Sequence, residues 1–272
     1  MRAAVLGRPV GHSLSPVLHT AAYRALGLDW TYTALDCGED ELAGTLAGLG
    51  PEWAGLSLTM PLKRVALALA DDVDPLAAAV GAANTLVLGR RRVAYNTDVA
   101  GIAAALREAG VTAPGSAVLL GAGGTAQAAL AALAGLGVRE PVVLVRDPGR
   151  AGPLRDTAAR LGLAVDLRAG LPGPIPDADL VVSTLPAGAA DGLTPPATAV
   201  LDVIYAPWPT RFAAAAAGRG ATVVGGLAML LHQAAAQVEL MTGRTAPVEA
   251  MRSALAAAVR AGTEKPAGAP AS

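Results

Sequence analysis

Residues 116–126, with the sequence SAVLLGAGGTA, decide the fold. The segment SAVLL is typical of a strand buried in a parallel sheet, and it leads into the pattern G-x-G-x-x-A. Gly121 permits a tight turn, Gly123 lets the backbone approach a pyrophosphate, and Ala126 is small enough for a helix to pack closely on the strand. The stretch therefore has the chemistry of a dinucleotide-binding turn.

The residues around this turn complete a strand–turn–helix–strand unit. An Ala- and Leu-rich helix is expected over 126–136, and a second strand over 142–145. Backbone N–H groups at the start of such a helix face an anion. A glycine-rich turn without a ligand is the alternative, but the flanking strands favour a cofactor site formed by Gly121, Ala122, Gly123, Gly124, Thr125 and Ala126.

The end of the second strand decides which cofactor binds. An Asp or Glu there binds the ribose 2′-hydroxyl of NAD, whereas an Arg favours the 2′-phosphate of NADP. Here Arg146 and Arg150 could clamp a phosphate from two sides, and Asp147 argues for the opposite preference. Alternatively, each arginine is a solvated surface charge with no role in binding. We predict NADP(H), with NAD left open because of Asp147.

Composition excludes several classes of protein. Hydrophobic residues make up 53% of the 272, and no charge occurs between Glu108 and Arg139. That stretch is long enough for a membrane span, but its glycines and its dominance by Ala argue for a buried β-turn-α unit instead. The net charge of −1 offers no field for nucleic acid. The lone Cys37 suits a reducing cytoplasm, and the three histidines show no metal-ligand spacing, so no metal is expected.

Strands and helices alternate along the whole chain, which predicts an α/β fold. The pattern restarts near 97–101, and the region that follows has the βαβ repeat of a doubly wound, Rossmann-like sheet. In the first part, Ser15 is expected to cap a helix over 16–26. Thr59 is expected to cap a second helix that runs to about residue 70. The chain thus divides into two α/β domains.

Small polar groups concentrate in four segments of the first part, at residues 11–16, 57–63, 81–85 and 96–101. All four lie where strands or loops meet helices. Hydroxyls, amides, one ammonium and one carboxylate that converge in a cleft could hold a small polyhydroxylated acid. Lys63 beside Asp98 is a plausible proton-transfer pair, and a structural salt bridge is the alternative.

Together these segments resemble the shikimate/quinate dehydrogenase family. The matching motifs run in family order over about residues 5–260: GRPVGHSLSPVLH, SLTMPLK, GAANTL, NTDVAG, GAGGTA, DVIYAPWPT and GGLAMLLHQAA. Several separate motifs in order are far more specific than any one of them. The resemblance implies NADPH-dependent reduction of 3-dehydroshikimate to shikimate, by a monomer or homodimer that binds neither nucleic acid nor membrane.

The resemblance also assigns roles. Residues 1–98 with 235–262 should form the substrate domain and 99–234 the NADP domain, while 263–272 are expected to be a disordered tail. Lys63 and Asp98 are the expected catalytic pair. The substrate should contact Ser13, Ser15, Thr59, Lys63, Asn84, Asp98, Tyr205 and Gln233. The cofactor should contact the glycine-rich turn together with Arg146, Asp147, Arg150, Ile204, Gly226 and Met229.

Three places depart from the family pattern, and one of them, Thr20 in place of the family's Asn, is expected to have little effect. Ser57 stands where the family usually has Asn, and Val145-Arg146-Asp147 replaces Asn-Arg-Thr, which weakens the expected 2′-phosphate site. Three functions therefore compete. The first is NADP-dependent shikimate dehydrogenase, the second a quinate/shikimate dehydrogenase with NAD or mixed cofactor use. The third is a non-catalytic nucleotide-binding regulator on the same fold, which the presence of both Lys63 and Asp98 disfavours.

Overall fold

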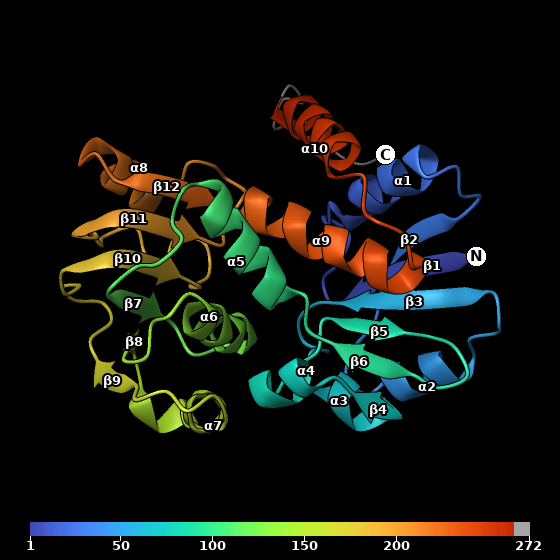
Figure 1. The fold of residues 1–272 in the computed structure, drawn as a ribbon, viewed down its shortest axis with the longest axis horizontal. Helices are drawn as coiled ribbons and strands as arrows, with labels where there is room; N and C mark the ends of the chain where they lie inside the picture. The colour runs from blue at the N-terminus through green and yellow to red at the C-terminus, as the bar shows by residue number, and fades with distance from the viewer. Residues whose placement is uncertain (264–272) are drawn as a thin grey trace, which may run out of the picture.

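Two six-stranded sheets organise the chain in the computed structural model, which describes residues 1–263 (Figure 1). The first sheet is mixed and has the order β2-β1-β3-β5-β6-β4. Its strands are β1 (Arg2–Gly7), β2 (Thr31–Asp36), β3 (Trp53–Leu58), β4 (Asp72–Val73), β5 (Thr85–Val87) and β6 (Val93–Tyr95). The parallel β1, β2 and β3 form one side, and the antiparallel β5 and β6 extend it.

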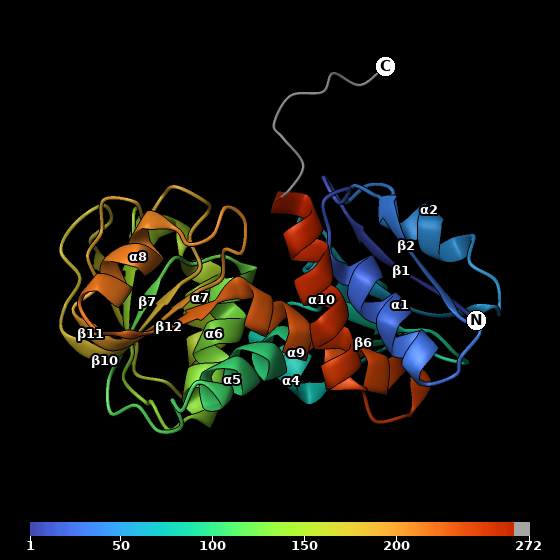
Figure 2. The same ribbon diagram turned by 90° about the horizontal axis from the view of Figure 1, so that it is seen from above.

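Five helices pack with this sheet, and we call sheet and helices together the first half. They are α1 (Ser15–Ala25), α2 (Leu42–Ala47), α3 (Val65–Leu69), α4 (Pro75–Val80) and α10 (Val248–Thr263). The last of these comes from the far end of the sequence and lies against α1 (Figure 2). Apolar residues of α1, β1 and α10 share one core cluster, which holds the C-terminal helix on the N-terminal sheet.

The second sheet is wholly parallel, with the order β12-β11-β10-β7-β8-β9. Its strands are β7 (Ala117–Leu120), β8 (Val142–Val145), β9 (Asp166–Ala169), β10 (Ala178–Ser183), β11 (Ala197–Asp202) and β12 (Thr222–Gly225). With α6 (Gly124–Gly135), α7 (Gly152–Arg160) and α8 (Arg211–Gly218) it forms the second half. The strand order reverses beside β7, so the glycine-rich turn lies at the switch point where such sheets bind ligands.

Two long helices connect the halves. Helix α5 (Asp98–Glu108) leaves the first sheet and α9 (Gly226–Thr242) returns from the second, and they pack against each other in what we call the helix crossing (Figures 1 and 2). At Gly101 a Cβ atom would lie 2.8 Å from the carbonyl oxygen of Met229, so only glycine permits this approach. His232 Nε2 and Glu108 Oε2, 2.6 Å apart, close the outer end of the crossing.

The structure confirms the α/β class and the doubly wound second sheet, and it corrects several local predictions. The helix expected from Thr59 begins only at Val65, because residues 60–64 form turns. Helix α1 has no side-chain cap, so the N-cap assigned to Ser15 is wrong. Thr263 ends α10, which contradicts the expected start of the tail, and 264–272 lie outside the described residues.

The uncharged stretch from residue 109 to 138 contains β7 and α6, and most of their residues are buried. Its lack of charge reflects its place inside the second half, as the sequence predicts. Among the helices of residues 1–263, none combines the length and apolar character required to cross a membrane.

Candidate active site

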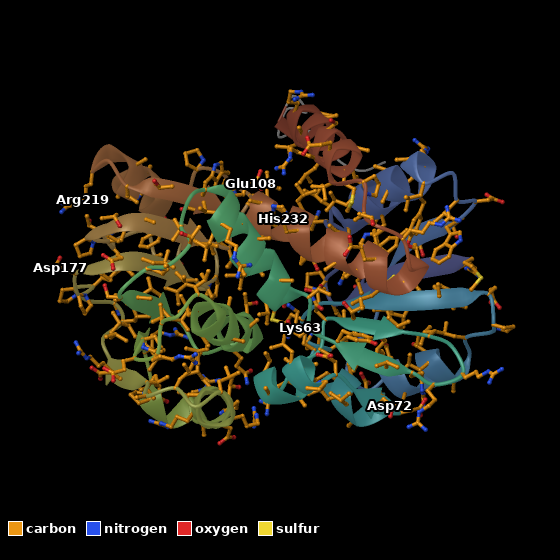
Figure 3. The ribbon with its side chains drawn as sticks, viewed as in Figure 1. Lys63, Asp72, Glu108, Asp177, Arg219 and His232 are labelled. Carbon is orange, nitrogen blue, oxygen red and sulfur yellow. The ribbon has the colours of Figure 1, made fainter. Side chains whose placement is uncertain are left out.

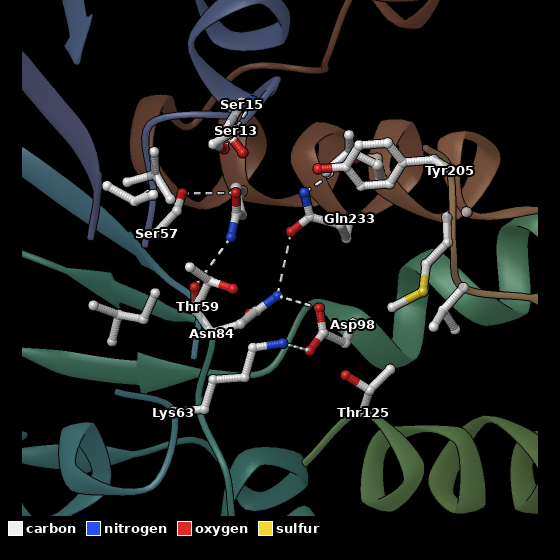
Figure 4. A pocket seen from close by; sticks show the side chains of 18 of the residues that line it. Ser13, Ser15, Ser57, Thr59, Lys63, Asn84, Asp98, Thr125, Tyr205 and Gln233 are labelled. Atoms are coloured by element: carbon white, nitrogen blue, oxygen red, sulfur yellow. Dashed lines mark hydrogen bonds and ion pairs between the residues drawn. The ribbon is translucent and has the colours of Figure 1, made fainter. Parts of the chain in front are cut away.

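Lys63 and Asp98 meet between the two halves (Figures 3 and 4). Lys63 lies in the turn before α3, and Asp98 is the first residue of α5. The lysine Nζ donates to Asp98 Oδ2 at 2.6 Å, and the two side chains are only 18% and 6% exposed. A charge pair this well shielded from water interacts more strongly than one on the surface. The ammonium is thus held in place by the carboxylate at the edge of a cleft.

Asn84 orients the carboxylate of this pair. The backbone N–H of Thr97 donates to Asn84 Oδ1 at 2.8 Å, which fixes the direction of the amide because a backbone N–H can only donate. Asn84 Nδ2 then donates to Asp98 Oδ1 at 2.8 Å. Both oxygens of the Asp98 carboxylate are therefore occupied, one by the lysine and one by the amide, and Asn84 itself is 2% exposed.

The pair borders a cleft of about 320 Å³. This volume suits a small polar molecule. All eight side chains predicted to contact a substrate line it: Ser13, Ser15, Thr59, Lys63, Asn84, Asp98, Tyr205 and Gln233. Figure 4 shows Ser13 and Ser15 at one end of the cleft, with Lys63 and Thr125 at the other. Four sequence segments that lie far apart along the chain therefore meet at one place.

Ser13 and Ser15 form a small polar corner of the cleft. The Ser15 N–H donates to Ser13 Oγ at 3.2 Å, so the first N–H group of α1 has a partner in the preceding loop. Pro16 occupies the first turn of α1, where its missing N–H leaves nothing unsatisfied. Both serine hydroxyls remain directed at the cleft (Figure 4).

Ser57 and Gln237 also line the cleft, and the sequence analysis gave no role to Gln237. Gln237 Nε2 donates to the backbone oxygen of Asn84 at 3.1 Å and to Thr85 Oγ1 at 3.0 Å, which turns its Oε1 toward Ser57. Ser57 Oγ donates to that oxygen at 2.7 Å and accepts from the Tyr32 hydroxyl at 2.6 Å. The Ser57 hydroxyl hydrogen is therefore already committed within the protein.

His19 lies beneath this network as a buried neutral ring. It stacks on Tyr32 with ring centroids 3.9 Å apart, and its Nδ1 donates to the Ser15 carbonyl at 2.9 Å. Burial lowers the pKa of His19 to about 4, despite that hydrogen bond. Burial likewise raises the pKa of the Tyr32 hydroxyl. Both groups are uncharged near neutral pH and support the cleft from behind.

The glycine-rich turn adjoins the cleft from the second half. Gly121 has a φ of +108°, and a Cβ there would lie 2.7 Å from Thr184 Oγ1, so the tight turn requires glycine. A Cβ on Gly123, the N-cap of α6, would meet nothing within 4 Å. The first turn of α6 has neither a side-chain cap nor an acidic residue, which leaves its N–H groups for an anion.

These observations fit the pyrophosphate of a dinucleotide. Space above Gly123 and uncapped N–H groups are the two features that the backbone must provide. A Cβ on Gly124 would lie 4.0 Å from Lys63 Cδ, and Thr125 itself lines the cleft. The cofactor turn of the second half and the lysine of the first half are therefore neighbours.

Arg146, Asp147 and Arg150 follow β8 on the surface, away from the cleft lining. Asp147 Oδ1 accepts from the N–H of Gly149 at 2.8 Å and caps the short 3-10 turn Pro148–Arg150. Within residues 1–263, neither arginine side chain has a hydrogen bond or ion pair. The carboxylate thus has a local structural partner, whereas both guanidinium groups remain available for a phosphate.

The remaining predicted cofactor positions lie in the loop after β11 and at the start of α9, which follows β12. Met229, Gly226 and Tyr205 line the cleft, whereas Ile204 lies beside it and donates its N–H to Asp202. A Cβ on Gly226 would lie 2.1 Å from the Val203 carbonyl oxygen, so glycine is required for this contact. Burial raises the pKa of the Tyr205 hydroxyl, which is therefore protonated near neutral pH.

Two parts of the chain match models of a known protein family. Residues 5–86 match the family model "Shikimate dehydrogenase substrate binding domain", and residues 226–256 match "Shikimate 5'-dehydrogenase C-terminal domain". A shikimate dehydrogenase (NADP(+)) of Moorella thermoacetica is 41% identical over 97% of this chain and 95% of its own. The chain belongs to the shikimate dehydrogenase family.

Solved structures of this family have the same fold over the whole chain. Shikimate dehydrogenase of Mycobacterium tuberculosis has a TM-score of 0.87 and 48% identity, covering 94% of this chain and 99% of its own. A shikimate 5-dehydrogenase of Thermus thermophilus, in complex with NADP(H) and shikimate, has a TM-score of 0.84 and 35% identity, with coverages of 95% and 99%. Membership therefore extends to both halves of the chain.

Proposed function

We propose that this protein is an NADP-dependent shikimate dehydrogenase, which reduces 3-dehydroshikimate to shikimate reversibly. One observation carries the proposal: the Lys63–Asp98 pair borders a polar cleft and also adjoins the glycine-rich turn at Gly124. The family relatives named for this activity cover nearly the whole chain, which supports the same assignment.

The two halves divide the work in this proposal. Residues 1–98 with 235–262 bind the substrate, and residues 99–234 bind the cofactor. The helix crossing joins the two regions, so Asp98 at the start of α5 and Gln233 on α9 stand at the boundary. The partner is a small molecule. A monomer or homodimer and a cytoplasmic location stay predictions from the sequence.

The substrate is held mainly by side chains of the first half, with Asp98 and Gln233 from the helix crossing. Ser13 and Ser15 bind its carboxylate at their end of the cleft, and Thr59, Asn84 and Gln233 take the ring hydroxyls together with the catalytic pair. Such hydroxyl and amide groups match a polyhydroxylated ring, because each ring hydroxyl both donates and accepts. Tyr205 lies near the carboxylate.

Lys63 supplies the proton of the reaction. Bound NADPH supplies a hydride to the carbonyl carbon, and the oxygen must then gain a proton to become a hydroxyl. Lys63 donates it from Nζ, or stabilises the developing negative charge, in a cleft sheltered from water. Asp98 holds the ammonium in place through the ion pair at 2.6 Å.

Backbone groups and arginines hold the cofactor. The turn formed by Gly121, Ala122, Gly123, Gly124, Thr125 and Ala126, at the N-terminus of α6, would hold the pyrophosphate through its backbone N–H groups. Arg146 and Arg150 hold the 2′-phosphate of NADP, with Asp147 beside them. Ile204, Gly226 and Met229 lie at the nicotinamide end.

An assay of the purified protein tests the proposal. Oxidation of shikimate is followed by the absorbance of the reduced cofactor, with shikimate or quinate as substrate and NADP⁺ or NAD⁺ as cofactor. We expect the highest kcat/KM for shikimate with NADP⁺. Absence of NADP-coupled oxidation of shikimate contradicts the proposal, and a higher kcat/KM for quinate or for NAD⁺ favours the second candidate function.

A further inference from the structure

A buried polar contact joins the halves at a second place, away from the helix crossing. Helix α4 of the first half ends at Val80 against α6 and α7 of the second half (Figure 1). Gln127 on α6 and Thr157 on α7 are 2% and 0% exposed. Both side chains are directed at the carbonyl groups that end α4.

The contacts at this place are specific. Thr157 Oγ1 donates to the Val80 carbonyl at 2.7 Å, and Gln127 Nε2 donates to the same carbonyl at 3.0 Å and to Thr157 Oγ1 at 2.8 Å. Arg160 Nε donates to the Ala79 carbonyl at 2.8 Å. The last carbonyls of a helix have no partner within it, so side chains from the other half complete α4. We call Gln127, Thr157 and Arg160 the clasp.

The clasp acts on segments that lead directly to the active site. After Val80 the chain turns at Gly81 and reaches Asn84 three residues later, and the Ala83 N–H donates to the Lys63 carbonyl at 2.7 Å. On the other side, Gln127 lies one turn into α6, whose N-terminus adjoins Lys63. The end of α4 thus connects to the substrate residues, and its partners lie on the helix that opens the cofactor turn.

We propose that Gln127 and Thr157 are positioning residues. They hold the second half, with its glycine-rich turn, in a fixed position relative to Lys63 and Asn84. The proposal rests on the function proposed above. Apolar packing alone tolerates sliding, whereas hydrogen bonds from both residues to the Val80 carbonyl fix one arrangement. Register matters because a misplacement of about 1 Å far from the chemistry can cost on the order of 100-fold in rate.

Thr157→Val tests this role, since valine has the same shape and lacks the hydroxyl. We expect kcat for shikimate oxidation to fall about tenfold, while KM for shikimate and for NADP⁺ changes less than about twofold. Without any ligand, amide hydrogen exchange of residues 75–84 should become faster, because α4 loses its partner. Thr157→Ser, which keeps the hydroxyl, should restore both properties.

Thr198→Val is the matched control. Its hydroxyl donates to the Asp179 carbonyl at 2.8 Å and joins two strands within the second half alone. It should leave kcat and the exchange of residues 75–84 unchanged. The inference is overturned if Thr157→Val keeps wild-type kcat, or if Thr198→Val lowers kcat equally.

Two further outcomes are distinguishable. If Thr157→Val does not fold, Gln127→Met replaces it, because methionine matches glutamine in length and lacks the donor; wild-type kcat in that variant overturns the inference. A wild-type protein that does not oxidise shikimate contradicts the proposed function itself, before any variant is compared.

Discussion

The two halves of this molecule recognise their ligands by different means. At the cleft of the first half, polar side chains form one hydrogen-bond network, which runs from the supporting Tyr32 through Ser57 and Gln237 to Asn84 and Asp98 and includes residues of the helix crossing. In the second half, the turn at Gly121 and Gly123 offers backbone N–H groups and open space. The cleft therefore depends on particular polar side chains, whereas the glycine-rich turn depends on glycines that leave the backbone N–H groups accessible.

The comparison predicts that single substitutions harm the first half most. Lys63→Ala removes the only ammonium among the described residues that line the cleft, and we expect kcat to fall by about 1,000-fold. Binding of shikimate, measured by titration, should weaken far less. Arg64→Ala, one exposed residue further along, is the control and should keep wild-type kcat. Survival of turnover in Lys63→Ala would remove the lysine from the mechanism.

Acid should destabilise the first half through His19. Its pKa is about 4 in the fold and 6.5 ordinarily, so the fold favours the neutral ring. This contribution is complete above pH 6.5 and is lost as the pH falls toward 4, by on the order of 3 kcal/mol. Urea unfolding at several pH values should show a steeper loss for the wild type than for His19→Gln.

The exposed His12 provides the control, because its substitution leaves the buried ring of His19 in place. His12→Gln should keep the wild-type dependence of unfolding free energy on pH. Equal slopes for His19→Gln and the wild type would show that the buried ring does not carry the acid sensitivity.

Gln237→Met tests the hydrogen-bond network that lines the cleft. The substitution keeps the volume but leaves the Ser57 hydroxyl without its acceptor, at a cost of about 1–3 kcal/mol in unfolding free energy. We expect kcat/KM for shikimate to fall about tenfold. Glu239→Gln, on the exposed side of the same helix, should change neither quantity. An unchanged kcat/KM in Gln237→Met would restrict Gln237 to a structural role.

The smallest effect is expected at Asp147 in the second half. Asp147→Asn keeps an oxygen for the Gly149 N–H and removes the negative charge beside Arg146 and Arg150. Because exposed charges interact by about 0.2–1 kcal/mol, KM for NADP⁺ should fall about threefold or less, with KM for NAD⁺ unchanged. Asp156→Asn on α7 is the control. A rise in KM for NADP⁺ would show that the carboxylate assists binding.

The structure brings the candidate site residues together in one cleft, whereas it differs from several predictions of the local structure around them. Lys63, Asn84 and Asp98 lie in sequence motifs whose residue types and order along the chain are characteristic, and all three line the same cleft. Gln237 was missed because its signal is only a spacing, four residues after Gln233, which places both on one face of α9. Its partners Ser57 and Thr85 come from strands that only the folded sheet brings near.

The helix predictions were wrong where contacts with distant parts of the chain determine where a helix begins or ends. Helix α4 was not predicted, although Asp74 caps it and Pro75 starts it, because six residues give little periodicity. Its end is completed by Gln127 and Thr157 from the other half, which no local pattern records. Around Thr59, conversely, capping residue types favoured a helix that the turns at 60–64 delay.

The helix crossing at Gly101 has a mechanical consequence. Two bodies joined at one place can tilt in any direction, whereas joining them at a second place leaves a single rotation about the line through both. The crossing and the clasp are two such places, and Lys63 is bonded near both, to Ala83 just after the clasped end of α4 and to Asp98 at the start of α5. Because displacement in a rotation grows with distance from its axis, the outer ends of the halves can swing apart while the reacting groups stay nearly still.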